Sequence, residues 1–142
     1  MQEDNKKENE LKKEYLKSYG DAVRAEQAIE DEIQQLRLER MLPSYVQEFM
    51  SKEADGRETM AEYVGKVDEL LDELKTSLYV RIDLRKEVIR KIEAISDETE
   101  KIVLRYRYIQ LLKWEEIAMK MSYSWKQIHR IHDSALMHFR MT

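Results

Sequence analysis

Glycine and proline are scarce in this chain, whose 142 residues include three glycines and one proline. Because these two residues interrupt regular structure most often, their scarcity favours long helices joined by few turns. Apolar residues keep helical spacing from Leu11 to about Met41, and Pro43 follows as a stop signal, which predicts a first long helix. Residues 1–10 are nine-tenths polar and have no apolar period, so we expect a disordered tail there.

A second long helix is predicted from about Glu58 to Ala94, where apolar residues alternate spacings of four and three as in a coiled coil. The two helices have similar expected lengths, which favours an antiparallel hairpin over residues 11–94. Ser44 and Gln47 form a capping-box pattern that predicts a short connecting helix between them. A two-helix hairpin leaves apolar flanks uncovered, so a homodimer through the hairpin is one expected assembly.

The C-terminal segment has the pattern of a helix-turn-helix. A short apolar-faced helix ends near Ala118, about six residues turn the chain, and a second helix starts at Ser124. The Ser124 hydroxyl and the Gln127 amide are spaced as a capping box, which fixes the start of that helix. The predicted fold is therefore all-α, a long antiparallel coiled-coil-like hairpin followed by a helix-turn-helix domain over residues 95–142. The inner face of the second motif helix should carry Ile128, Ile131, Ala135 and Leu136, and its outer face Trp125, Lys126, His129 and Arg130.

The stretch from Ile95 to Arg140 resembles the fourth conserved region of bacterial sigma factors. The residues that carry the resemblance are the segment 104–108 (Leu-Arg-Tyr-Arg-Tyr) and the segment 115–118 (Glu-Glu-Ile-Ala). The longer pattern is similar to small phage-encoded sigma-like regulators. The family usually has glycine in each inter-helix turn, where this chain has Leu111 and Ser122. A side chain with a β-carbon is costly at positive φ, so we expect these turns to differ in shape.

The charge of the chain is divided along its length. Residues 1–100 carry 17 Lys+Arg and 26 Asp+Glu, a net charge of −9, whereas residues 101–142 carry 8 and 3, a net charge of +5. A basic end can contact phosphates while the acidic end stays away from DNA. The division therefore favours double-stranded DNA as the partner of the motif.

Several classes of protein are not expected. The chain has no cysteine, no run of eighteen apolar residues and no secretory signal pattern, which indicates a cytoplasmic protein without membrane spans. It has no glycine-rich phosphate loop, nucleophile elbow or zinc-hydrolase motif, so neither an enzyme nor a bound cofactor is expected. His129, His132 and Asp133 have metal-ligand spacing but no third convergent ligand nearby in sequence, and no metal site is predicted.

Two classes of function stay open. The first is a phage-type transcriptional regulator that contacts promoter DNA, and with it the polymerase surface that sigma region four touches. The second is a structural or assembly protein, such as a small DNA-packaging subunit or a protein-binding adaptor. Trp114 is expected in the core, and Arg107 is expected to hold the motif helices together by pairing with Glu116. For Trp125, a DNA contact and a packing role are equally open. The candidate DNA-binding residues are Lys120, Trp125, Lys126, His129 and Arg130.

Overall fold

The computed structural model describes residues 2–43 and 58–142. Within these ranges every regular element is a helix and no strand is present, so the predicted all-α class is confirmed. No helix in the described ranges combines the length and the apolar character that crossing a membrane requires. The chain divides into two compact units. The motif unit contains residues 2–23 and 81–142, and the hairpin unit contains residues 24–43 and 58–80.

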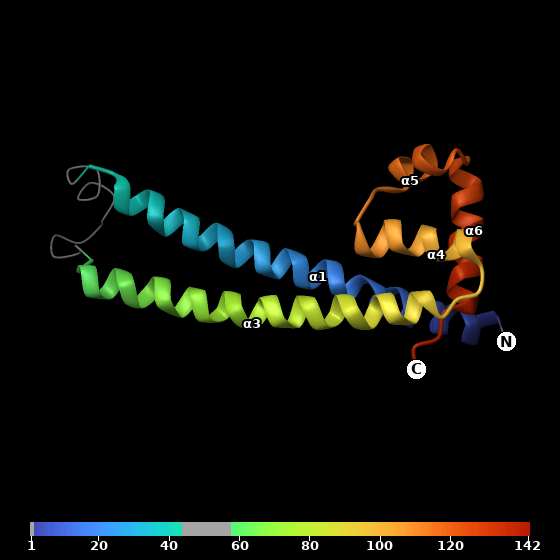
Figure 1. Ribbon diagram of the computed structural model, residues 1–142, viewed down its shortest axis with the longest axis horizontal. Coiled ribbons are helices and arrows are strands. Elements are labelled where there is room, and N and C mark those ends of the chain that lie inside the picture. The colour runs from blue at the N-terminus through green and yellow to red at the C-terminus, as the bar shows by residue number, and fades with distance from the viewer. Residues whose placement is uncertain (1, 44–57) are drawn as a thin grey trace. The chain divides into compact units, whose positions relative to one another are not determined.

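Two long helices and four shorter ones follow one another along the described chain (Figure 1). The long helices α1 and α3 each run through both units, and the shorter helices all belong to the motif unit. The bounds are α1 Gln2–Met41, α3 Met60–Glu93, α4 Glu98–Leu104, the π-helix η1 Arg105–Ile109, α5 Trp114–Met121 and α6 Trp125–His138. The predicted connecting helix that starts at Ser44 lies outside the described residues.

Residues 2–10 form the first turns of α1, which corrects the expectation of a disordered tail. Glutamate, lysine and glutamine dominate these turns, and all three are good helix formers. The following turns are held by tertiary contacts, because Lys12 is buried and its Nζ donates to the carbonyl oxygen of Leu136 at 2.8 Å. A helix that is anchored at residues 12–19 extends readily into a polar segment that has no helix breaker.

In the hairpin unit the end of α1 lies beside the start of α3. Arg40 Nη1 donates to the carbonyl oxygen of Glu58 at 3.1 Å, and its guanidinium lies 5.4 Å from the centre of the Tyr63 ring. This is the arrangement of an antiparallel hairpin. Burial is slight, because Ile33 is the one buried hydrophobic residue among the described residues of this unit.

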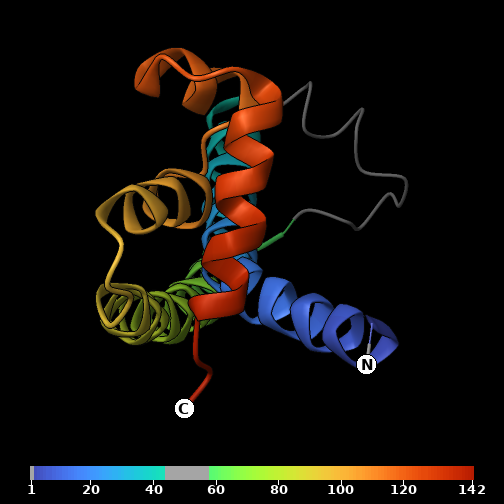
Figure 2. The ribbon, with the colours of Figure 1, turned by 90° about the vertical axis from the view of Figure 1, so that its right-hand side faces the viewer.

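The described residues of the motif unit form two hydrophobic clusters. Figure 2 shows how α4 and α5 are arranged beside α6. The smaller cluster joins α4, α5 and α6 through Val103, Ile117 and Ile128, none of which is exposed. The larger cluster joins α1 and α3 to the C-terminal helices. Its members are Leu16, Tyr19, Val88, Ile92, Ile95, Leu104, Tyr108, Ile109, Ala135, Leu136 and Phe139.

Candidate nucleic-acid interface

The turn before α5 and the turn after it both contain a residue in the left-handed conformation. Leu111 has φ 59° and Ser122 has φ 57°, and these are the two non-glycine residues with positive φ in the described chain. The Ser122 amide donates to the Met119 carbonyl, and the Tyr123 amide donates to that of Ala118. These bonds close the C-terminal end of α5 as in a glycine-capped helix. Both positions thus adopt the positive φ at which glycine is usual, and each bears a conformational cost that glycine would avoid.

The start of α6 has the predicted capping box. The Gln127 amide donates to Ser124 Oγ at 3.1 Å, and the Ser124 amide donates to Gln127 Oε1 at 2.9 Å. Ser124 has an extended backbone, as an N-cap residue should. The direction of α6 is thus set at its first turn, and Gln127 is engaged in the cap.

The two helices of the motif meet through apolar side chains. Ile117 of α5 and Ile128 of α6 are fully buried together with Val103 of α4. Trp114 and Ile131 are half-buried and pack against this cluster, so Trp114 lies at the core as predicted. These contacts take up the inner side of α6 and leave Trp125, Lys126 and Arg130 exposed.

His129 is held between two tryptophan rings. Its ring centre lies 4.5 Å from that of Trp114 and 3.9 Å from that of Trp125. The Nε2 atom is buried and has no hydrogen-bond partner. The expected outward position of His129 is therefore corrected. Its imidazole packs against two neighbouring aromatic rings, which shield it from water. This aromatic stack links α5 to the first turns of α6.

The remaining candidate residues are exposed. Trp125 is 57% exposed on the outer side of the aromatic stack. Lys126 and Arg130 are exposed and four residues apart, which places them on one face of α6. Lys120 is exposed in the last turn of α5, and its Nζ lies 6.0 Å from the centre of the Tyr106 ring. Three of the five candidates thus share the first two turns of α6 with free access to solvent, and Lys120 is presented by the preceding helix.

Two further basic residues of the motif unit, Arg105 and Arg107, have structural partners. Arg107 Nη1 donates to the carbonyl oxygen of Leu112 at 3.0 Å, and its guanidinium lies 4.5 Å from the centre of the Trp114 ring. The structural role was predicted, although with Glu116 as the partner. Arg105 Nη1 donates to Glu93 Oε1 at 2.7 Å. Both side chains therefore brace the motif rather than extend its basic surface.

A buried histidine lies one turn beyond the exposed part of α6. His132 Nε2 and the Tyr108 hydroxyl share a hydrogen bond of 2.7 Å, and the His132 ring meets the Trp114 ring edge-on. Burial lowers the pKa of His132 to about 3, and neighbouring positive charges act in the same direction. Burial also raises the pKa of Tyr108 to about 12. Both groups are neutral at physiological pH, so this pair adds no charge to the interface.

Sequence reasoning missed two contacts that hold the second half of α6. Glu100 of α4 is buried and accepts a hydrogen bond from Ser134 Oγ at 2.6 Å, while His138 Nδ1 lies 2.9 Å from its Oε2. The spacing of Ser134 and His138, four residues apart, indicates that they share a face of α6, but it does not reveal the partner. The second contact is the Lys12 bond to Leu136, described above.

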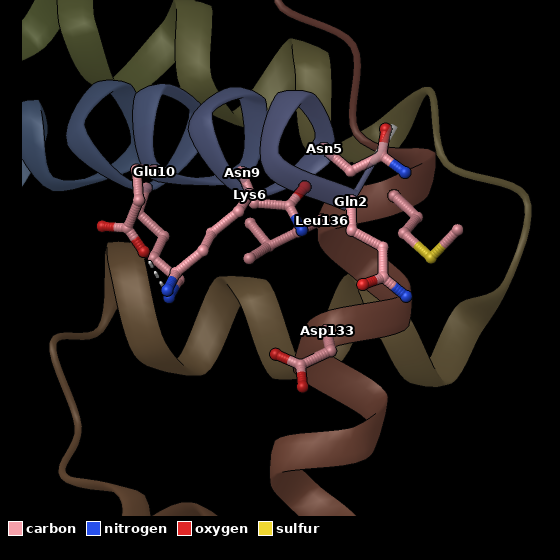
Figure 3. Close-up of a pocket in the computed structure, with 9 residues that line it drawn as sticks. Gln2, Asn5, Lys6, Asn9, Glu10, Asp133 and Leu136 are labelled. Carbon is pink, nitrogen blue, oxygen red and sulfur yellow. Dashed lines mark hydrogen bonds and ion pairs between the residues drawn. The ribbon is translucent and has the colours of Figure 1, made fainter.

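The first turns of α1 cross the second half of α6, and a polar groove of about 400 Å³ lies between them (Figure 3). Gln2, Asn5, Lys6 and Asn9 line it from α1, and Asp133 faces it from α6. Glu10 Oε1 accepts from Lys13 Nζ at 3.2 Å on the same side of α1. The groove therefore combines lysine, acidic and amide side chains, whereas the first two turns of α6 carry the exposed cations Lys126 and Arg130.

Comparison of the chain with protein-family models, with curated proteins and with solved structures finds no match.

Proposed function

We propose that this chain binds double-stranded DNA through the exposed side of the first two turns of α6. The observation that supports the proposal is the pairing of α5 and α6 across a left-handed turn, with Lys126 and Arg130 exposed side by side. A helix whose inner face is buried and whose first turns carry cations is suited to the major groove. The first turn of α6 contains no acidic residue, so its helix dipole also favours an approaching phosphate.

Each candidate residue has a distinct role in this proposal. Lys126 and Arg130 read base edges, and Arg130 is suited to guanine because a guanidinium can donate two parallel hydrogen bonds. Trp125 stands at the rim of the groove, and Lys120 contacts a phosphate. His129 supports the position of Trp125 by stacking between the two tryptophans, and in this proposal it does not itself contact DNA.

The biological role proposed for this binding is transcriptional regulation of the phage type. It rests on the resemblance of residues 95–140 to sigma region four, and the same resemblance is the reason to propose RNA polymerase as a second partner. An assembly or packaging protein would bind DNA through the same face with little sequence preference. Sequence preference therefore separates the two classes.

The test is a selection of preferred sequences from random DNA duplexes, followed by anisotropy titrations of wild type and variants. Arg130→Ala should lose about 1 to 3 kcal/mol on the preferred site and relax its specificity. Lys120→Ala should weaken all sequences alike and reduce the salt dependence by about one counterion. Arg90→Ala is the matched control, because Arg90 is an exposed arginine of α3 outside the proposed face.

Three outcomes would decide the matter. If Arg130→Ala and Lys126→Ala bind every duplex as wild type does, α6 is not the DNA-binding element. If wild type binds tightly but selection yields no preferred sequence, the assembly class replaces the regulator. Retention of RNA polymerase on immobilised wild type, and its loss with a variant of the motif unit, would support the regulatory role.

A further inference from the structure

An apolar strip runs along α3 in the hairpin unit. It consists of Val64, Leu71 and Leu78, which follow one another at intervals of seven residues. Val64 is 45% exposed and Leu71 is 42% exposed, while Leu78 is half-buried. Residues seven apart drift by only about 20° around a helix, so the three side chains stay on one face. We call this face the α3 strip.

The hairpin unit has little else to hold it together. Its one buried hydrophobic residue among the described residues is Ile33, and the strip leaves large aliphatic side chains in water. Full burial of such a side chain contributes about 1.5 to 3 kcal/mol, so covering the strip would stabilise the unit substantially. A heptad spacing on a helix is the pattern by which one helix packs against another. The α3 strip is therefore suited to packing against another helix.

We propose that the partner is α3 of a second copy of this chain, antiparallel to the first, with a two-fold axis at Leu71. In this register Leu71 meets its own counterpart, and Val64 meets Leu78 of the second copy, because both lie seven residues from the axis. The strip is therefore complementary to itself in the antiparallel direction, as a two-fold symmetric interface requires.

The charges that border the strip favour the same register. Asp68 and Lys75 are exposed, seven residues apart, and lie on the same side of the strip. In an antiparallel pair, residues on the same side of the strip lie on the same side of the interface. With the axis at Leu71, Asp68 of each copy lies opposite a position one residue away from Lys75 of the other copy. In a parallel pair these two positions would lie on opposite sides of the contact and would not meet. Exposed pairs of this kind add little stability, but they select orientation.

Cysteine cross-linking tests the proposal cleanly, because the chain has no cysteine of its own. Leu71→Cys should form a disulfide-linked dimer under mild oxidation, since a two-fold axis brings the two residues within bonding distance. Val64→Cys and Leu78→Cys should cross-link with each other when the two variants are mixed, but neither with itself. Met119→Cys gives the background, because Met119 is 82% exposed on α5 and lies outside the strip.

Sedimentation of the full chain tests the assembly without cysteines. Wild type should have twice the mass of one chain, and Leu71→Asp should return it to one chain while far-UV circular dichroism shows the helices intact. Asp68→Lys should weaken the dimer by about tenfold, and adding Lys75→Asp to the same chain should restore it.

Two results would overturn the proposal. A wild-type mass of one chain, with no cross-linking of Leu71→Cys above the Met119→Cys background, would remove the dimer. Self-cross-linking of Val64→Cys as efficient as that of Leu71→Cys would show a parallel pair and would refute the register. Neither result bears on the proposed DNA binding, because no residue of the α3 strip belongs to α6.

Discussion

Acidification should destabilise the motif unit through His132. This side chain is 3% exposed, and its folded-state pKa of about 3 lies far below that of an unfolded histidine, about 6.5. At a pH between these two pKa values, His132 is protonated in the unfolded chain and neutral in the folded chain. The contribution of neutral His132 to folding stability is therefore present above pH 6.5 and is lost as the pH falls. Desolvation is the main cause, and positive charges add to it from Lys13, His129, Arg107 and Lys17.

The size of the effect follows from the proton linkage. An unfolded histidine is about one quarter protonated at pH 7 and almost fully protonated at pH 5, while folded His132 stays neutral throughout. Integrating this difference lowers the free energy of unfolding by about 2 kcal/mol between pH 7 and pH 5. The loss continues at about 1.4 kcal/mol per pH unit until the folded pKa is approached.

Urea unfolding followed by far-UV circular dichroism, at pH 7 and pH 5, measures this loss in wild type and in His132→Gln. Glutamine fills a similar volume and does not titrate, so the variant should lose about 2 kcal/mol less than wild type on acidification. The difference between the two proteins cancels the pH dependence that they share. Tyr108→Phe is the control, since it removes the hydrogen bond and keeps the buried imidazole. Equal losses in wild type and His132→Gln would refute the neutral buried histidine.

Three further predictions can be checked in the same unfolding assay. Ser122→Gly should stabilise the chain by about 0.5 to 1 kcal/mol, because glycine removes the strain of a positive φ. As a control, Met119→Gly within α5 should destabilise the chain by about 1 kcal/mol. If both variants or neither variant stabilised the chain, the reasoning would be contradicted. Ser124→Ala should cost about 1 kcal/mol through loss of the cap, with an unchanged DNA preference in the anisotropy titration. Lys12→Met should lower the free energy of unfolding by about 1 to 3 kcal/mol, because methionine keeps the packing but leaves the Leu136 carbonyl without its donor. An unchanged free energy of unfolding would show that water replaces the lysine.

The features that the sequence predicted correctly are local. The capping box of Ser124 and Gln127 lies within three residues, and its geometry depends on little else. The stop at Pro43 and the spacing of apolar residues in α3 are of the same kind, and α3 runs from Met60 to Glu93 against an expected 58–94. Such patterns are legible because the residues that decide them are neighbours in the chain.

The features that it missed depend on distant partners. The Lys12 bond to Leu136 joins residues 124 positions apart, and nothing near Lys12 in sequence indicates that α1 continues through residues 2–10. His129 was placed outward from helical spacing alone, whereas two tryptophans from different helices hold its ring. Arg107 found a carbonyl and an aromatic face instead of Glu116. In each case a tertiary contact decides the side-chain conformation, and the local sequence does not predict that contact.

Tertiary contacts fix the second half of α6, and the first half carries the exposed residues of the proposed DNA-binding face. The second half is fixed from two sides, by Lys12 at the Leu136 carbonyl and by the buried Glu100 at Ser134. The first half meets only α5 and α4 on its inner side and presents Lys126 and Arg130 outward. A helix whose backbone is fixed along one half can present its first turns at a defined angle. In the proposed DNA complex the backbone of α6 would therefore not have to be ordered on binding, which lowers the entropic cost of association.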